Sequence, residues 1–417
     1  MKAKWFVAVF FALVLGFGWS LAWANDPPQF PQNATFSTLI TTPRAIEGLT
    51  GDNAGNLYTG GAAITSLGDT FCPVWRINLS SPSLVLVGKL PTPCSPLGMA
   101  FNDAGDLFVA DGANAKVWSF TPNAATPPTA TAFATGTPGA NGVAFDRDGN
   151  LWLSDGVANR GRVWRIGPSG GVCETSFTGC TEVFRIQAMR NGTALGGNIS
   201  VVPTAAEPTQ GVGRSANTFP HTAAGGNRQD LAANGLAFNH RGDLLVADTA
   251  RGAIWKVEFD HQGNLASETN CDTTFTANTL CLNNVFVAHP ILEGADGIAL
   301  DKAGNIWVDA NERNAVAVVT KDGRVAEVFR NPANTAGLRN SADTTAGDAH
   351  IVEFPTSPFL SGKTFCTASS DGNRRDNFPR SAGEVDGGNT TGTGKDLGKI
   401  SCMDQELIIQ GLPLPIH

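Results

Sequence analysis

The chain has 417 residues and a formal net charge of −8 at pH 7. Nucleic-acid-binding proteins are usually basic, so this acidic balance argues against a nucleic-acid partner. Beyond the first residues, no apolar run approaches the roughly 20 residues that a membrane-spanning helix needs. We therefore expect neither a nucleic acid nor a membrane among the partners.

The N-terminus has the layout of a secretory signal peptide. It begins with Lys2 and Lys4, continues as an apolar run to Leu21, and ends on the small-x-small sequence Ala22-Trp23-Ala24. A positive start, an apolar stretch and a small-residue cleavage site are the three parts of such a signal. We predict a cleaved signal over residues 1–24 and an exported mature chain over residues 25–417, secreted or periplasmic.

The main feature of the mature chain is an internal repeat. Five segments share a glycine, an alternating apolar run, an Asp- or Asn-containing turn with a second glycine, and another apolar run. The five glycine pairs are Gly48 and Gly55, Gly98 and Gly105, Gly142 and Gly149, Gly235 and Gly242, and Gly297 and Gly304. Alternating apolar residues joined by a Gly turn predict a β-hairpin. A third and a fourth strand, such as residues 162–166 and 182–186, complete a propeller blade.

A sixth, degenerate unit runs from Pro355 to Cys366. We expect the strand near residues 34–40 to pair with residues 399–402, which would join the two ends of the chain in one blade and remove the open sheet edges. The fold class predicted is therefore all-β: one domain forming a six-bladed β-propeller with four-stranded blades.

The longest gap in the repeat lies between Gly142 and Gly235. Either a seventh blade or an inserted loop would fill it. Residues 188–232 are rich in Gly, Asn, Thr, Pro and Ala and lack the turn pattern, which favours a loop inserted between blades 3 and 4. Long loops in compact domains are usually functional or disordered.

Eight cysteines lie in the mature part. An even number in an exported chain predicts disulfides rather than metal thiolates. A preference for short loops gives four local pairs, although other connectivities are possible: Cys72 with Cys94, Cys173 with Cys180, Cys271 with Cys281, and Cys366 with Cys402.

Residues that recur in every blade are expected to serve the blade rather than one site. The turn positions give Asp103, Asp146, Asn239 and Asp301, and the strand ends give Asp111, Asp155, Asp248 and Asp309. We interpret both sets as structural.

The residue before the first glycine of each unit varies instead. It begins the strand expected to line the central channel, and the six blades have Glu47, Leu97, Asn141, Asn234, Asp296 and Thr356 there. Two buried carboxylates are costly unless a cation or a proton compensates them. Oxygen donors without His or Cys suit a hard cation, so Ca2+ is the first choice, with Mg2+, Mn2+ or Zn2+ as alternatives. A hydrated polar channel without a metal is the competing interpretation.

Several of these elements resemble the senescence marker protein/gluconolactonase/luciferin-regenerating enzyme family. They are Ile46-Glu47-Gly48, Ala140-Asn141-Gly142, residues 233–238, residues 294–298, and the C-terminal Phe354-Pro355-Thr356-Ser357. Members are six-bladed propellers that hold a divalent metal in the channel. The resemblance implies that Glu47, Asn141, Asn234 and Asp296 are the metal ligands here.

The resemblance implies a metal-dependent hydrolase that opens a lactone or a related ester, with Asp296 as the catalytic residue, and the predicted signal peptide makes it an exported one. One alternative is a non-catalytic propeller that binds a ligand or a protein. Others are a phosphotriesterase-like hydrolase and a strictosidine-synthase-like condensation. The enzyme hypothesis implies a small-molecule substrate, and we expect a monomer.

Four further residues are candidates for substrate binding. Thr356 occupies the channel position of blade 6, and His350 precedes that blade. Arg214 and His221 belong to the predicted insertion, which could form a lid. A solvated surface loop is the alternative for both histidines.

Overall fold

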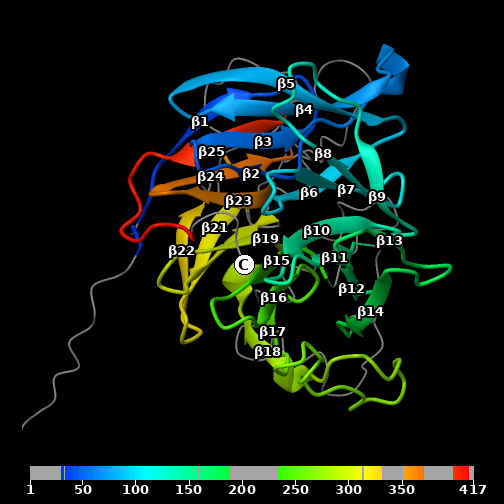
Figure 1. Cartoon of the computed structure of the whole chain (residues 1–417). Helices are drawn as coiled ribbons and strands as arrows, with labels where there is room; N and C mark the ends of the chain where they lie inside the picture. Colours follow the sequence, from blue (N-terminus) through cyan, green and yellow to red (C-terminus); the bar gives the residue numbers. More distant parts are fainter. Residues whose placement is uncertain are drawn as a thin grey trace, which may run out of the picture.

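The computed structural model describes residues 30–31, 33–156, 160–187, 233–311, 314–330, 351–352, 354–370 and 398–412. Six sheets follow one another around a central axis (Figure 1). The prediction of an all-β, six-bladed propeller is therefore confirmed. The predicted signal, residues 1–24, and the predicted insertion, residues 188–232, lie outside the described residues.

Each blade runs from an inner strand at the axis to an outer strand. Blade 1 contains β2 (Thr50–Gly51), β3 (Asn56–Gly60), β4 (Phe71–Asn78) and β5 (Ser81–Pro91). Blade 2 contains β6 (Pro96–Phe101), β7 (Leu107–Asp111), β8 (Lys116–Phe120) and β9 (Thr131–Thr135). Blade 3 contains β10 (Ala140–Phe145), β11 (Leu151–Asp155), β12 (Arg162–Ile166) and β14 (Cys180–Arg185).

The second half of the ring repeats this plan. Blade 4 contains β15 (Leu236–Phe238), β16 (Leu244–Asp248), β17 (Ala253–Val257) and β18 (Val285–Ala288). Blade 5 contains β19 (Ala295–Leu300), β20 (Ile306–Ala310), β21 (Ala315–Val319) and β22 (Val325–Arg330). Blade 6 contains β23 (Pro355–Ser361), β24 (Thr364–Ser369), β25 (Lys399–Met403) and the N-terminal β1 (Phe36–Thr41).

Three short 3-10 helices and one additional strand complete the described secondary structure. The helices are η1 (Thr65–Leu67), η4 (Leu282–Asn284) and η5 (Pro290–Leu292). Strand β13 (Gly171–Val172) pairs in parallel with β9 and gives blade 2 a fifth strand that the repeat pattern does not predict.

The hairpin between the first two strands of a blade depends on one Asp or Asn side chain in the turn. In blade 3 the carboxylate of Asp146 accepts the backbone N–H groups of Asp148 and Asn150 at 3.0 and 2.9 Å. Its second oxygen accepts the indole N–H of Trp152 at 2.8 Å, and Gly149 has the positive φ of 78° that the turn requires. These bonds confirm that Asp146 is structural.

Blade 2 departs from the predicted assignment at this turn. The side chain that accepts the backbone N–H of Asp106, at 2.8 Å, is Asn102 and not Asp103. Asn102 corresponds to Asp146 of blade 3 because it stands three residues before the turn glycine, Gly105.

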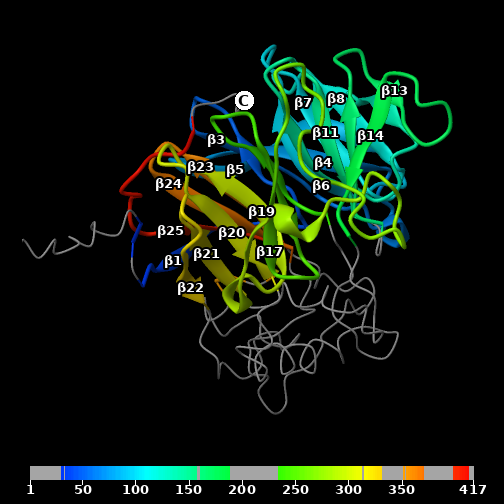
Figure 2. The same cartoon turned by 90° about the horizontal axis from the view of Figure 1, so that it is seen from below.

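Blade 6 closes the ring by combining both ends of the chain. β1 pairs antiparallel with β25, with Phe36 opposite Met403, as the sequence predicts. Figure 2 shows β1 beside β25 in the same sheet as β23 and β24. The bond between Cys366 and Cys402 joins β24 to β25 in this sheet.

Apolar side chains fill the layers between neighbouring blades. Between blades 4 and 5, Leu245 packs in one cluster with Ile298 and Val308. Between blades 5 and 6, the ring centroids of Trp307 and Phe365 are 5.0 Å apart. The ring is therefore held by packing between sheets as well as by the shared blade 6.

All four predicted disulfide pairs are present: Cys72 with Cys94, Cys173 with Cys180, Cys271 with Cys281, and Cys366 with Cys402. Four disulfides fit an oxidising compartment. No helix among the described residues is long and apolar enough to span a membrane.

Candidate functional site

The inner strands meet around the axis through glycine contacts. A Cβ atom built on Gly142 would lie 2.3 Å from the carbonyl oxygen of Asn234 in the next blade, and one on Gly235 would lie 2.4 Å from that of Asp296. Gly48, Gly98 and Gly297 face the carbonyls of Leu97, Asn141 and Thr356 in the same way. Only glycine permits so close an approach. The residue before each glycine is thereby held in one ring around the channel.

Blade 6 completes this ring differently because Ser357 replaces the glycine there. The hydroxyl of Thr356 donates a hydrogen bond of 2.7 Å to the carbonyl oxygen of Glu47 in blade 1. It also lies 3.3 Å from the carbonyl oxygen of Ala368. Thr356 is thus placed at the channel ring, and the described contacts of its hydroxyl are to the backbone.

The four predicted ligands lie in this ring. Asn141, Asn234 and Asp296 are buried, with 7%, 2% and 4% of their surfaces exposed, and Glu47 is half-buried. The apolar Leu97 of blade 2 is also half-buried. The ring therefore brings two carboxyl groups and two amides to one end of the channel.

Asp296 is in an acidic environment. Burial raises the pKa of its carboxyl well above the ordinary value, and repulsion from Glu47 and, less strongly, from Asp309 in their ionised forms raises it further. Hydrogen bonds from Asn311 and Asn234 act in the opposite direction. Among the described residues no Lys, Arg or His forms an ion pair with Asp296.

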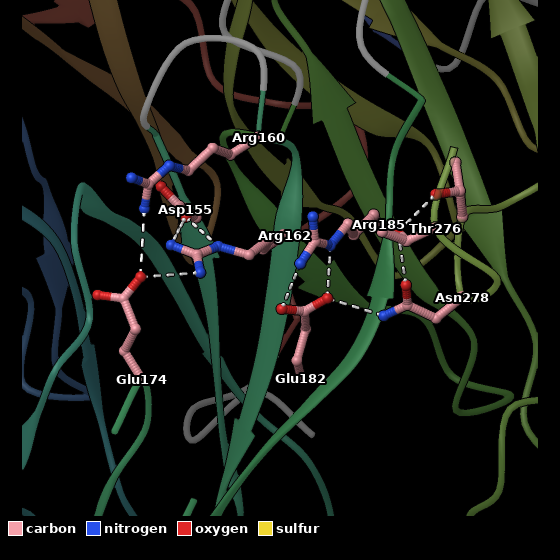
Figure 3. Close-up of polar contacts among 9 residues, drawn as sticks. Asp155, Arg160, Arg162, Glu174, Glu182, Arg185, Thr276 and Asn278 are labelled. Atoms are coloured by element: carbon pink, nitrogen blue, oxygen red, sulfur yellow. Dashed lines mark hydrogen bonds and ion pairs between the residues drawn. The ribbon is translucent and has the colours of Figure 1, made fainter. Parts of the chain in front are cut away.

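Two other buried aspartates of the same fold have arginine partners. Asp155, at the end of β11, lies 2.5 Å from a guanidinium nitrogen of Arg162, which also contacts Glu174 (Figure 3). Asp248, at the end of β16, lies 2.8 Å from Arg251. These contacts confirm that the strand-end aspartates of blades 3 and 4 are structural.

In blades 4 and 5 the channel residue forms a hydrogen bond with a side chain fifteen residues further along the chain. Asn311 stands fifteen residues after Asp296 and donates a hydrogen bond of 2.7 Å to its Oδ2 atom. Thr249 stands fifteen residues after Asn234 and accepts a bond of 3.0 Å from its Nδ2 atom. In blade 3 the same position is Gly156, where a Cβ would lie only 2.8 Å from Nδ2 of Asn141.

Asp309 does not belong to the strand-end group in which the sequence pattern places it. β7, β11 and β16 end on their aspartates, whereas β20 ends on Ala310, one residue after Asp309. Since successive side chains of a strand point to opposite faces, this shift turns Asp309 toward blade 6. There its Oδ2 atom accepts a bond of 2.5 Å from the hydroxyl of Thr367.

The burial of Asp309 has an electrostatic consequence. Its Oδ1 atom has no hydrogen-bond partner among the described residues, and burial raises the pKa of this carboxyl well above the ordinary value. At the corresponding position blades 1 to 4 have small residues: Gly60, Ala110, Ser154 and Ala247. Asp309 is therefore a third acid of the channel region. Among blades 1 to 5, only blade 5 has an acidic residue at this strand position.

The other end of the channel is apolar. A cavity of about 110 Å³ is lined there by residues of all six inner strands, among them Phe101, Phe145 and Phe238. Leu412 also lines it and donates its backbone N–H to the carbonyl of Leu300. The hydrogen-bonding chemistry of the channel is thus concentrated at the end that contains Asp296.

The three remaining predicted site residues, Arg214, His221 and His350, lie outside the described residues. Elsewhere in the described part of the chain, Glu268 lies close to Cys271 and Cys281 in a group of potential metal-binding atoms. The two sulfur atoms form a disulfide and so are not thiolate ligands.

Sequence reasoning missed Asn311, Thr249 and the position of Asp309. No motif contains the first two, but both stand fifteen residues after a channel residue, a spacing that the repeat alone could have given. Asp309 could have been recognised by counting from the turn glycine, because it is one residue closer to Gly304 than Asp248 is to Gly242.

A known protein family matches the part of the chain that contains blades 4 and 5. Residues 226–337 match a family model described as "SMP-30/Gluconolactonase/LRE-like region". The family resemblance is confirmed. The matched segment includes Asn234, Asp296 and both of the residues that follow them by fifteen positions.

Solved structures show the same fold. The calcium-binding protein regucalcin from Agrobacterium tumefaciens str. C58 is 13% identical, with a TM-score of 0.51 over 92% of this chain and 97% of that chain. A luciferin-regenerating enzyme is 11% identical, with a TM-score of 0.54 over 91% of this chain and 98% of that chain. A search of curated proteins gave no match.

Proposed function

We propose that the chain is an exported hydrolase that depends on a divalent cation, Ca2+ as the first choice, and opens a lactone or a related ester. The observation that carries this proposal is the environment of Asp296: it is buried, and the charged groups that act on its pKa, Glu47 and Asp309, are both acids. Buried acids gathered in this way call for a compensating cation or proton. The family match supports the reaction class.

The donor set fits such a cation. Glu47 and Asp296 together offer a charge of −2 when ionised, and the amide oxygens of Asn141 and Asn234 add neutral donors. All four are oxygen ligands, which Ca2+, Mg2+ and Mn2+ prefer. A divalent cation held by these residues would supply Lewis-acid polarisation of the substrate carbonyl.

The residues themselves assign the remaining roles. Asn311 orients the Asp296 carboxyl through its bond to Oδ2, and the carboxylate would accept a proton from the attacking water. The water oxygen adds to the carbonyl carbon, the acyl–oxygen bond breaks, and Asp296 returns the proton to the leaving oxygen. While its amide oxygen would hold the cation, the N–H groups of the buried Asn141 would donate to the substrate.

The experiment is a hydrolysis screen of lactones and aryl esters with the mature protein, before and after EDTA treatment. We expect activity that EDTA removes and added Ca2+ restores. Asp296→Asn should lose at least about a hundred-fold in kcat, the scale of general-base catalysis. Asp322→Asn changes an acid of blade 5 whose side chain is 55% exposed, and it should leave activity unchanged.

Two other outcomes would redirect the proposal. Cation binding without hydrolysis of any ester would favour a non-catalytic binding module. Hydrolysis of phosphotriesters but of no lactone would favour the phosphotriesterase-like alternative.

We also propose that the protein is a secreted or periplasmic monomer that acts on a small molecule. The four disulfides support an oxidising compartment. N-terminal sequencing of the exported protein should begin at Asn25. Export with residues 1–24 retained would contradict the predicted cleavage.

A further inference from the structure

Two of the four channel donors are held by a side chain from the same blade. Asn311 donates to Oδ2 of Asp296 at 2.7 Å, and Thr249 accepts from Nδ2 of Asn234 at 3.0 Å. All four side chains are buried. Hydrogen bonds in such surroundings fix the rotamers of both partners.

The blade itself does not require these contacts. In blades 2 and 3 the corresponding residues are Gly112 and Gly156, which have no side chain to offer. Both blades nevertheless have four regular strands of their own. The hydrogen-bonding residue therefore occurs where the channel residue is Asn234 or Asp296, and a structural need common to all blades does not explain it.

Thr249 also determines which atom Asn234 presents. The hydroxyl hydrogen of Thr249 is committed to the carbonyl oxygen of Ala295, at 2.7 Å. A hydroxyl has a single hydrogen, so Thr249 can only accept from Asn234. The amide must turn its nitrogen toward Thr249, which leaves its oxygen, the ligating atom, available to the channel.

Asn311 has the complementary effect on Asp296. Because the Asn311 amide donates to Oδ2, the orientation of the Asp296 carboxyl is fixed. We propose that Asn311 and Thr249 are positioning residues that preset the donor atoms of Asp296 and Asn234 for the cation. This inference rests on the proposed function, since it assumes that the four channel residues bind a divalent cation.

The chain offers a matched control for Asn311. Asn305 lies in the same blade, is equally buried, and donates from Nδ2 to Oδ2 of Asp301 at 2.8 Å. That bond lies in the hairpin turn at the far end of β19 and β20 from Asp296. Asn311→Ala and Asn305→Ala therefore remove the same kind of bond from the same blade, and only the first removes it from the channel.

The test is calorimetric titration of the metal-free, full-length mature protein with Ca2+, with melting temperatures measured in parallel. Asn311→Ala should weaken the Kd about ten- to a hundred-fold, the usual effect of removing a group that orients a metal ligand. Asn305→Ala should lower the melting temperature comparably but leave the Kd within about two-fold. Asn311→Ser, which keeps a donor, should recover part of the affinity.

Thr249→Val provides a second variant in case Asn311→Ala does not fold. It should also weaken the Kd, and Thr249→Ser should restore it. Equal Ca2+ affinity in the wild type, Asn311→Ala and Thr249→Val would overturn the positioning role while leaving the proposed function intact. A wild type that binds none of Ca2+, Mg2+, Mn2+ and Zn2+ would overturn the proposed function and this role together.

Discussion

Blade 3 and the channel treat buried carboxyl groups in opposite ways. In blade 3, Asp155 contacts the guanidinium of Arg162, a side chain that is only 8% exposed (Figure 3). In the channel, Asp296 is influenced by Glu47 and Asp309, which are acids. The same fold therefore pairs one buried aspartate with its own arginine and leaves another without a cationic partner among the described residues.

The two arrangements differ in whether the buried carboxylate can bind a ligand. An internal ion pair satisfies the carboxylate permanently, so removing one partner of the pair destabilises the fold. A carboxylate without an internal cation is costly in the empty protein but is open to a ligand. We infer that blade 3 shows the structural use of a buried acid and the channel its functional use.

The largest effect should come from breaking the internally paired acid. Arg162→Ala leaves Asp155 buried without its guanidinium and removes the stacking of Arg162 on Trp164, whose ring centre is 5.1 Å away. We expect the free energy of unfolding to fall by about 3–5 kcal/mol. Urea denaturation would measure it.

Arg324→Ala is the control, because Arg324 forms an ion pair with Asp322 but its side chain is 78% exposed. Its loss should cost less than about 1 kcal/mol. Equal losses in the two variants would show that Arg162 does not neutralise a buried charge.

The pH dependence of stability should report on Asp309. Its pKa is raised in the folded state, so the native protein holds a proton that the unfolded chain releases above about pH 3.9. Stability is therefore lost as pH rises from that value through the folded pKa, with a slope of at most about 1.4 kcal/mol per pH unit.

Asp309→Asn cannot titrate and should lack this contribution, while its amide oxygen can still accept from Thr367. Its unfolding free energy should depend less on pH than that of the wild type, as denaturation at a series of pH values would show. Parallel pH profiles would mean that Asp309 is ionised in both states.

Asp296→Asn should change the free energy of unfolding of the metal-free protein at pH 7 only slightly, and in the opposite direction to Arg162→Ala. Removing an acid that faces Glu47 and Asp309 should leave the unfolding free energy unchanged or raise it by about 1 kcal/mol. Adding Ca2+ should raise the melting temperature of the wild type and not of the variant. A strong loss of stability without Ca2+ would mean that Asp296 has an internal partner that stabilises its charge.

Some parts of the structure could be predicted from the sequence and others could not. The blades could be predicted because each hairpin repeats a local signal, such as Asp146 and Gly149, that needs no distant partner. The ring of Glu47, Asn141, Asn234 and Asp296 could be predicted because one position varied within a constant repeat.

The supporting residues could not be found in this way. Asn311 and Thr249 act through contacts between the start of the first strand and the end of the second, which no local motif encodes. The sequence groups Asp309 with the strand-end aspartates because residues one position apart look alike in a repeat, although their side chains point to opposite sides of a strand. The register in the folded sheet is what separates them.

The most direct test of the account is native mass spectrometry of the mature protein after incubation with Ca2+, beside Asp296→Asn and Glu47→Gln. The account predicts one divalent cation on each wild-type chain and none on either variant. A wild type that retains no cation with Ca2+, Mg2+, Mn2+ or Zn2+, or variants that retain it equally well, would contradict the claim that the channel acids are compensated by a bound metal.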